Sequence, residues 1–254
     1  MIALHSPLRL DTDKLTMPTP KAIFYDLDGT LRKSQPAGRD LFAEHAISLG
    51  LDISLADRLR SARWEHAYWA TSDDLRADLA FFGKEGRDFW RNYSLRQLRA
   101  LGCAENCANQ YAPLLSDYMD ANYQPQDFLF DGVPEALSGL RESGYVLAVV
   151  SNRDKPFAEY LREKEILHYL HFSLAAGEVS SWKPDPEIFL QAAQRADVDP
   201  ADAIYVGDNY YADILGARRA GLIPVLFDPD GVFPEADCSV IQTHDQIFDL
   251  LERM

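Results

Sequence analysis

The chain has few cysteines and no long apolar segment, which argues against a disulfide-rich protein and against a membrane-spanning one. Its 254 residues include only three cysteines, Cys103, Cys107 and Cys238, which are too few for a disulfide framework. Cys103 and Cys107 would share a helix face, but no neighbouring histidine or cysteine completes a zinc site. No stretch of about 18 apolar residues occurs, so no membrane span is expected. These shortages predict a cytoplasmic protein with reduced thiols.

Basic residues are scarce relative to acidic ones. The 25 lysines and arginines face 40 aspartates and glutamates, and the formal net charge is -15. Nucleic-acid affinity depends on cationic contacts to the phosphate backbone, so this balance argues against a nucleic-acid partner. A small anionic substrate would need a local positive site, which a lysine such as Lys183 and a bound metal ion could provide.

The first twenty residues contain no apolar segment of signal-peptide length, because charged residues and prolines interrupt them. Residues 1–20 are therefore predicted to be a poorly structured leader. Met17 stands just before the first predicted strand and is an alternative start of translation.

The most informative feature present is the run Asp26-Leu27-Asp28-Gly29-Thr30, directly after the apolar residues 22–25. An apolar run that ends in two carboxylates and a glycine indicates a buried strand with acids at its carboxyl end, where open α/β sheets bind ligands. Asp26 and Asp28 would point to opposite faces of a strand, and Gly29 allows the turn that brings them together. One carboxylate can then act as a nucleophile or metal ligand while the other moves protons.

Three later segments extend this pattern. An apolar run over 145–150 ends in Ser151-Asn152, and another over 203–206 ends in Gly207-Asp208, with Asp213 five residues beyond Asp208. Between them, Lys183-Pro184-Asp185-Pro186 precedes an amphipathic helix predicted over 187–195. An acid pair, a hydroxyl, a lysine and a last acid thus follow in chain order, three of the four at predicted strand ends.

Periodicity divides the chain into two kinds of structure. Between about residues 39 and 123 apolar residues recur at three- and four-residue steps, which predicts helices and no strand. The flanking stretches 31–36 and 123–126 are predicted to be a hinge and a return linker. After residue 128 strands and helices alternate, which predicts a parallel sheet with right-handed crossovers.

With these motifs in place, the chain resembles the haloacid dehalogenase-like hydrolase superfamily, and in particular its phosphoglycolate phosphatase-like branch. The resemblance covers all four short motifs and nearly the whole chain from about residue 21. It implies a Rossmann-like α/β core with an inserted all-helical cap that closes over the substrate. The expected division is a core of residues 21–32 and 128–254 and a cap of residues 33–127.

The resemblance also implies a role for each motif residue. Asp26 would attack phosphorus to give an aspartyl-phosphate, and Asp28 would be the general acid and base. Mg²⁺ would be held by the Asp26 carboxylate, the Asp28 main-chain carbonyl and the Asp208 carboxylate, with Asp213 orienting these ligands from behind. The phosphoryl oxygens would be bound by Ser151, Asn152 and Lys183.

Alternatives within and outside the family follow from the same residues. An acid at Asp28 separates this chain from the dehalogenating members, whose leaving halide needs no proton. Hydrolysis of a small phosphomonoester, a phosphorylated metabolite, is the favoured activity. A sugar-phosphate mutase remains an alternative, and a non-catalytic binding protein is a less favoured one. In the cap, Arg63 and His66 are candidates for contacting the distal part of the substrate, and the oligomeric state stays open.

Overall fold

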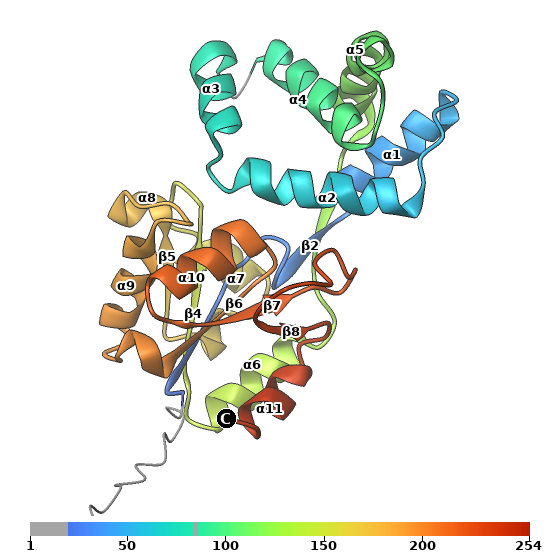
Figure 1. The fold of residues 1–254 in the computed structure, drawn as a ribbon. Helices are drawn as coiled ribbons and strands as arrows, with labels where there is room; N and C mark the ends of the chain where they lie inside the picture. Colours follow the sequence, from blue (N-terminus) through green and yellow to red (C-terminus); the bar gives the residue numbers. More distant parts are fainter. Residues whose placement is uncertain (1–19, 84–85) are drawn as a thin grey trace, which may run out of the picture.

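The computed structural model describes residues 20–83 and 86–254, and it contains a six-stranded parallel sheet with helices on both faces (Figure 1). The strand order is β5-β4-β1-β6-β7-β8. The strands are β1 (Ala22–Tyr25), β4 (Val146–Ser151), β5 (Phe172–Ala175), β6 (Ala203–Gly207), β7 (Ile223–Phe227) and β8 (Ser239–Ile241). The flanking helices are α6 (Val133–Glu142), α7 (Ala158–Glu163), α8 (Ala176–Val179), α9 (Pro186–Arg195), α10 (Leu215–Arg219) and α11 (Gln246–Leu251). The predicted Rossmann-like α/β core is confirmed.

Apolar side chains fill both faces of the sheet, which is why its central strands are continuous apolar runs. Successive residues of β1 point to opposite faces: Ile23 and Tyr25 pack with α6, α7 and α11, whereas Phe24 packs with α9 and α10. All four residues of β1 are buried. The rigid centre of the sheet therefore fixes the position of whatever follows β1.

The strand order places the motif residues at one edge. From β1 the chain continues on one side through β4 and β5, then crosses to the other side for β6, β7 and β8. The order thus reverses around β1, and the crevice at the carboxyl ends of strands beside such a reversal is where open α/β sheets bind ligands. The residues after β1, β4 and β6 meet at this crevice.

Five helices form a separate layer above that edge (Figure 1). They are α1 (Gly38–Ser48), α2 (Leu55–Trp69), α3 (Asp73–Phe82), α4 (Arg87–Ala100) and α5 (Glu105–Asn122). Apolar residues of α1, α4 and α5, including Phe42, Leu98 and Leu115, make one small core, and Tyr68 and Phe89 belong to a second. The inserted all-helical cap expected from the sequence is confirmed as an architecture, while its division at residues 33 and 127 stays a prediction.

The two connections between core and cap differ from the sequence prediction. The predicted hinge over 31–36 instead contains a strand, β2 (Arg32–Gln35), which pairs antiparallel with β3 (Gln126–Leu129), a strand that begins at the last residue of the predicted linker 123–126. Neither strand has the alternating apolar pattern that marks a strand in a sequence. The pair is held across the strands by Arg32, whose guanidinium donates to the Asp127 carboxylate, and by Ser34, which lies 3.3 Å from the same oxygen.

The remaining elements contain smaller differences. The pattern of residues 156–166 predicts one helix, but α7 covers only Ala158–Glu163 and a 3-10 turn at Leu167–Tyr169 follows it. The pattern of residues 213–220 likewise predicts a helix, and the structure has a π-helical turn, Tyr210–Ile214, before α10. Within the described ranges no helix is both long and apolar enough to cross a membrane. Met17 and all but the last residue of the predicted leader lie outside the described residues.

Candidate active site

A buried lysine joins two of the predicted acids. Asp26 directly follows β1, and its Oδ1 accepts a hydrogen bond from Lys183 Nζ at 2.6 Å. The same ammonium donates to Asp213 Oδ1 at 2.6 Å and to the Tyr205 hydroxyl at 3.0 Å. Tyr205 in turn donates to the Val150 carbonyl at 2.8 Å. The ends of β1 and β4, the Lys183 segment, β6 and the turn after β6 therefore meet in one hydrogen-bonded network beneath the crevice.

Burial makes this network electrostatically strong. Burial raises the pKa of Asp26 to about 7, although the charge of Lys183 opposes the rise. Burial alone would lower the pKa of Lys183, but Asp213 and Asp26 outweigh it and hold that pKa well above its usual value. Lys183 is therefore a permanent cation, and it partly neutralises two carboxylates in a place with little water.

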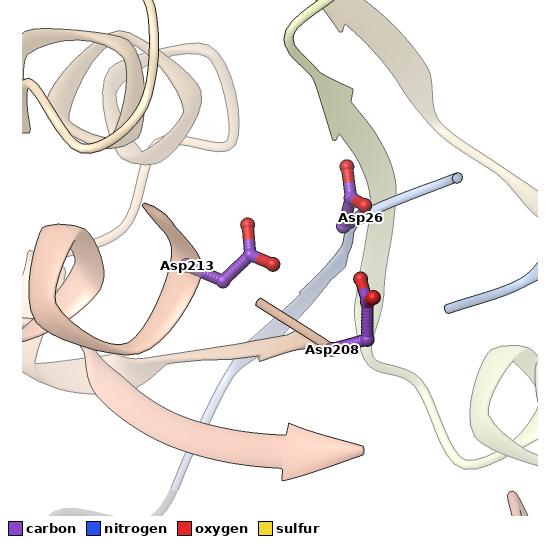
Figure 2. Close-up of side chains that lie close together, drawn as sticks. All are labelled: Asp26, Asp208 and Asp213. Atoms are coloured by element: carbon purple, nitrogen blue, oxygen red, sulfur yellow. The ribbon is translucent and has the colours of Figure 1, made fainter. Parts of the chain in front are cut away.

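A third carboxylate, Asp208, lies opposite Asp26 at the end of β6. Figure 2 shows Asp26, Asp208 and Asp213 close together, and one oxygen from each lies within 4.8 Å of the others. Thr30 orients Asp208, since its hydroxyl donates to Asp208 Oδ1 at 3.2 Å and accepts from the Asp208 amide at 2.9 Å. Burial, with the charges of Asp213 and Asp26, holds the pKa of Asp208 well above its usual value.

Two glycines allow the acids to approach this closely. A Cβ on Gly29 would lie 2.4 Å from Asp208 Oδ2, and a Cβ on Gly207 would lie 2.4 Å from Asp213 Cγ. Gly29 also has a φ of +90°, a conformation that residues with a side chain rarely adopt. Gly29 is thus required by contact and by backbone conformation, whereas Gly207 is required by contact.

We expect Gly29→Ala to destabilise the protein more than a positive φ alone explains. The control is Gly144→Ala, because Gly144 has a φ of +88° and nothing within 4 Å of its would-be Cβ. The control should lose about 1–2 kcal/mol from backbone strain alone. Gly29→Ala should lose at least about 1 kcal/mol more through overpacking against Asp208. Urea unfolding of both variants measures this difference, and equal losses would contradict the contact argument.

A buried histidine supports the Thr30 loop from behind. His244 Nε2 donates to the Thr30 carbonyl at 3.1 Å, and the ring stacks on Phe227 with centroids 4.5 Å apart. Burial lowers the pKa of His244 to about 4, so the imidazole is neutral at pH 7. This side chain was not among the sequence candidates, because nothing in its local sequence separates it from an ordinary core residue.

The buried, neutral state of His244 predicts a pH dependence of stability. The histidine pKa is about 6.5 in an unfolded chain, so between pH 6.5 and 4 the unfolded state binds a proton that the folded state does not. The stabilisation is complete above that range and is lost as the pH falls, by about 3 kcal/mol at most. We expect His244→Gln to show a smaller fall of Tm between pH 7 and 5 than wild type, with His45→Gln as control. An equal fall of Tm between pH 7 and 5 in wild type and His244→Gln would contradict the neutral state of the buried His244.

Asp28 lies near Asp26 but belongs to a different charge cluster. Arg153 Nη2 donates to Asp28 Oδ1 at 3.0 Å, and the Arg32 guanidinium donates to the same oxygen. Burial would raise the pKa of Asp28, but Arg153 and Arg32 together hold it below its usual value. Since Arg32 also pairs with Asp127 on β3, one arginine links this carboxylate to the strands that carry the cap.

The donor atoms present fit a divalent cation. Asp26 and Asp208 each keep a carboxylate oxygen with no hydrogen-bond partner among the described residues, and oxygen is the ligand that Mg²⁺ prefers. The Asp28 carbonyl accepts no main-chain hydrogen bond in the same ranges. By contrast, both oxygens of Asp213 are engaged, one by Lys183 and one by the Asn209 amide at 2.9 Å. This arrangement favours Asp213 as a supporting group.

Ser151 and Asn152 occupy different positions around Lys183. Ser151 is the last residue of β4 and is buried at the carboxyl edge of the sheet. Asn152 binds the main chain of Lys183 in both directions: its Oδ1 accepts from the Lys183 amide at 2.6 Å, and its Nδ2 donates to the Lys183 carbonyl at 3.0 Å. The side chain of Asn152 therefore positions the lysine segment in this structure.

The cap contacts the same site from above. Thr71 donates to the Lys183 carbonyl at 3.1 Å, and Asn209 donates to the His66 carbonyl at 2.9 Å. His66 Nδ1 lies 4.0 Å from Asp208 Oδ2 and faces the cavity between cap and core. Arg63 instead donates to the Val232 carbonyl and is not among the residues that line this cavity. Of the two cap candidates, His66 is the one placed at the cavity.

Sequence reasoning missed several residues that shape the site. It named Thr30 without giving it a role, and it did not single out Tyr205, Arg32, Arg153 or Asn209. Arg153 stands next to Asn152 after a predicted strand, so its position offered a signal. Arg32 offered none, because its partner Asp127 lies 95 residues away in the sequence.

Comparison with known proteins agrees with this geometry. Residues 20–221 match the sequence profile of the haloacid dehalogenase-like hydrolases. The chain is 31% identical over 207 residues to a glyceraldehyde 3-phosphate phosphatase of Methanopyrus kandleri, with 81% of this chain and 82% of that protein covered. It is 30% identical over 207 residues to the haloacid dehalogenase-like hydrolase domain-containing protein 3 of Mus musculus, with coverage of 80% and 79%.

Solved structures show the same fold. The crystal structure of a predicted phosphoglycolate phosphatase from Haemophilus somnus superposes with a TM-score of 0.56 at 21% identity, covering 92% of this chain and 99% of that one. The family expected from the four motifs is thus confirmed by sequence and by fold. The chain belongs to the haloacid dehalogenase-like hydrolase family of enzymes.

Proposed function

We propose that the protein is a Mg²⁺-dependent phosphatase that hydrolyses a small phosphomonoester through an aspartyl-phosphate on Asp26. The observation that carries this proposal is the buried network of Asp26, Lys183 and Asp213 with Asp208 opposite, at the edge of the sheet where ligands bind. The activity in the name of the Methanopyrus relative supports the same reaction class.

Asp26 carries the covalent step. A carboxylate oxygen of Asp26 forms a bond to phosphorus while the bond from phosphorus to the leaving alcohol oxygen breaks. Water then attacks the phosphorus of the aspartyl-phosphate and releases inorganic phosphate and the Asp26 carboxylate. The rigid end of β1 and the hydrogen bond from Lys183 hold this carboxylate in place throughout.

Asp28 moves the protons. It would give a proton to the leaving alcohol oxygen in the first step and take one from water in the second. With Arg153 and Arg32 bound, Asp28 is a carboxylate at neutral pH, which is the form needed for the second step. In the first step Asp28 must carry a proton, so its contacts with the two arginines must break. Because Arg32 also binds Asp127 on β3, breaking its contact with Asp28 is coupled to the strands between core and cap.

The groups that hold the phosphoryl oxygens are cationic or dipolar. A bound Mg²⁺, held by Asp26, the Asp28 carbonyl and Asp208, would supply charge neutralisation between the anionic nucleophile and the anionic substrate. Lys183 supplies a second positive charge next to Asp26. Ser151 would donate to a phosphoryl oxygen, and Asn152 would act there chiefly by fixing the Lys183 segment.

Phosphate release from a panel of phosphomonoesters, with Mg²⁺ and with chelator, tests the proposal. Turnover that requires the metal is expected, and its absence for every substrate would contradict phosphatase activity. Product analysis by ³¹P NMR separates hydrolysis from the mutase alternative, because a mutase moves the phosphoryl group to a second hydroxyl instead of to water. The three cysteines are free thiols, which supports the cytoplasmic location as part of this proposal.

A further inference from the structure

The cavity above the acids is larger than a two- or three-carbon phosphate needs. It has a volume of about 1030 Å³ and extends from Asp28 and Asp208 into the space between α1, α2, α4 and α5. Cavities of roughly 300–1,000 Å³ bind drug-sized ligands. The part that lies within the cap is the part that a leaving group would occupy, because the phosphoryl group must sit at Asp26.

Three aromatic side chains line that part, and we call Trp69, Trp90 and Tyr93 the aromatic wall. Their ring centroids are 5.6 to 6.3 Å apart, so they form one connected surface. Tyr93 is buried, whereas 43% of Trp90 is exposed. A half-open tryptophan on a cavity wall is a stacking surface for a ring, since ring faces and tryptophan attract by dispersion and electrostatics.

One carboxylate stands beside the aromatic wall without a cationic partner. Glu65 Oε1 accepts from the Tyr93 hydroxyl at 2.9 Å, and Tyr93 accepts from Trp69 Nε1 at 3.3 Å. Glu65 forms no ion pair within residues 20–83 and 86–254, and its second oxygen has no hydrogen-bond partner there. Two other carboxylates of the lining, Asp117 and Asp230, are already paired with Arg87 and Arg39.

Helix α2 carries several of these groups close together. His66 lies 4.0 Å from Asp208, and Glu65 is its neighbour in the chain. Trp69 follows Glu65 by four residues, so both lie on one face of α2. A ligand that reaches from the acids into the cap therefore meets the free oxygen of Glu65 and the aromatic wall next to each other.

We propose that the alcohol released by this enzyme carries a ring that stacks on the aromatic wall and a hydroxyl or amine that donates to Glu65. A nucleoside and a pyranose share this chemistry. Phosphoglycolate has no ring to stack on the aromatic wall, and any anionic group placed at Glu65 would meet a like charge. This inference rests on the proposed phosphatase function, because it places the phosphoryl group at Asp26.

The test compares ring-bearing and small substrates in matched variants. We measure kcat/KM with Mg²⁺ for AMP, glucose 6-phosphate, phosphoglycolate and glyceraldehyde 3-phosphate. Trp90→Ala is expected to lower the kcat/KM ratio of the preferred ring-bearing substrate to phosphoglycolate by about tenfold. Glu65→Gln keeps the contact with Tyr93 but removes the charge, and it should lower the same ratio by several-fold. The control is Phe81→Ala, a cap aromatic that is 82% exposed and away from the cavity.

A binding measurement separates this inference from the chemistry. Calorimetric titration of Asp26→Asn with AMP, glucose 6-phosphate or phosphoglycolate reads affinity without turnover. Tighter binding of a ring-bearing ester, weakened by Trp90→Ala, supports the inference, and whether AMP or glucose 6-phosphate binds tighter identifies the ring. Absence of hydrolysis of every ester would refute the phosphatase instead. This inference alone would be overturned by two results together. Phosphoglycolate would match the ring-bearing esters in kcat/KM and affinity, and Trp90→Ala would have the same effect as Phe81→Ala.

Discussion

Asp26→Asn is expected to lower kcat for phosphomonoester hydrolysis by about 10⁴-fold or more while leaving the protein folded. Asparagine has nearly the size of aspartate and keeps an oxygen that can accept the hydrogen bond from Lys183 at the end of β1. An amide is not a nucleophile, however, so the covalent step is lost. Stopped phosphate assays with Mg²⁺ measure the loss, and thermal unfolding verifies the fold.

The matched control for this substitution is Asp154→Asn, an exposed aspartate a few residues beyond Ser151. It should keep wild-type kcat, because its side chain makes no hydrogen bond with any part of the chain that the structure describes. Asp26→Ala guards against slow deamidation of the introduced asparagine back to aspartate. If both Asp26 variants retained more than about a tenth of wild-type kcat, the nucleophile would be another group and the aspartyl-phosphate would be wrong.

Much of this fold could be predicted because the core strands are continuous apolar runs. Residues 22–25 and 203–206 are almost entirely apolar, and parallel strands place their carboxyl ends at one edge. That geometry brings Asp26 and Asp208 together, while Lys183, from the loop before α9, reaches Asp26 across 157 residues of sequence. The predicted acids therefore converge for a reason that strand order supplies, and the roles given to them stay proposals until assayed.

The parts that sequence reasoning missed depend on tertiary contacts alone. β2 and β3 consist largely of polar residues, so they form because Arg32 and Asp127 meet across the pair and not because of local pattern. The arginine clamp on Asp28 draws one residue from β2 and one from the loop after β4. Glu65 looks like an ordinary helix acid until α4 brings Tyr93 to it. No spacing rule in the sequence connects these pairs.

Lys183→Met is expected to destabilise the protein by about 3–5 kcal/mol, because it leaves two buried carboxylates without their shared cation. Methionine matches the length of the lysine stem but cannot donate to Asp26 or Asp213. The pKa of Asp26, already raised to about 7 by burial, should rise further. A folded-state pKa above the unfolded value of about 3.9 means that stability falls as the pH rises, so the loss should be larger at pH 8 than at pH 5. Urea unfolding at both pH values measures it, with the exposed Lys155→Met as control.

Adding Asp213→Asn to Lys183→Met separates the structural role of the lysine from its role in the reaction. If the destabilisation comes from uncompensated charge, neutralising Asp213 should recover about 1 kcal/mol or more, and the two substitutions should be non-additive because the residues are in contact. Activity should not recover with stability, because the lysine cation next to the phosphoryl group is still missing. The loss of this cation should lower kcat by about 10²- to 10³-fold. A double variant that regained both would show that Lys183 serves only as a counterion in the core. A variant that regained stability alone would assign the lysine to both tasks, as its position between Asp26 and Asp213 predicts.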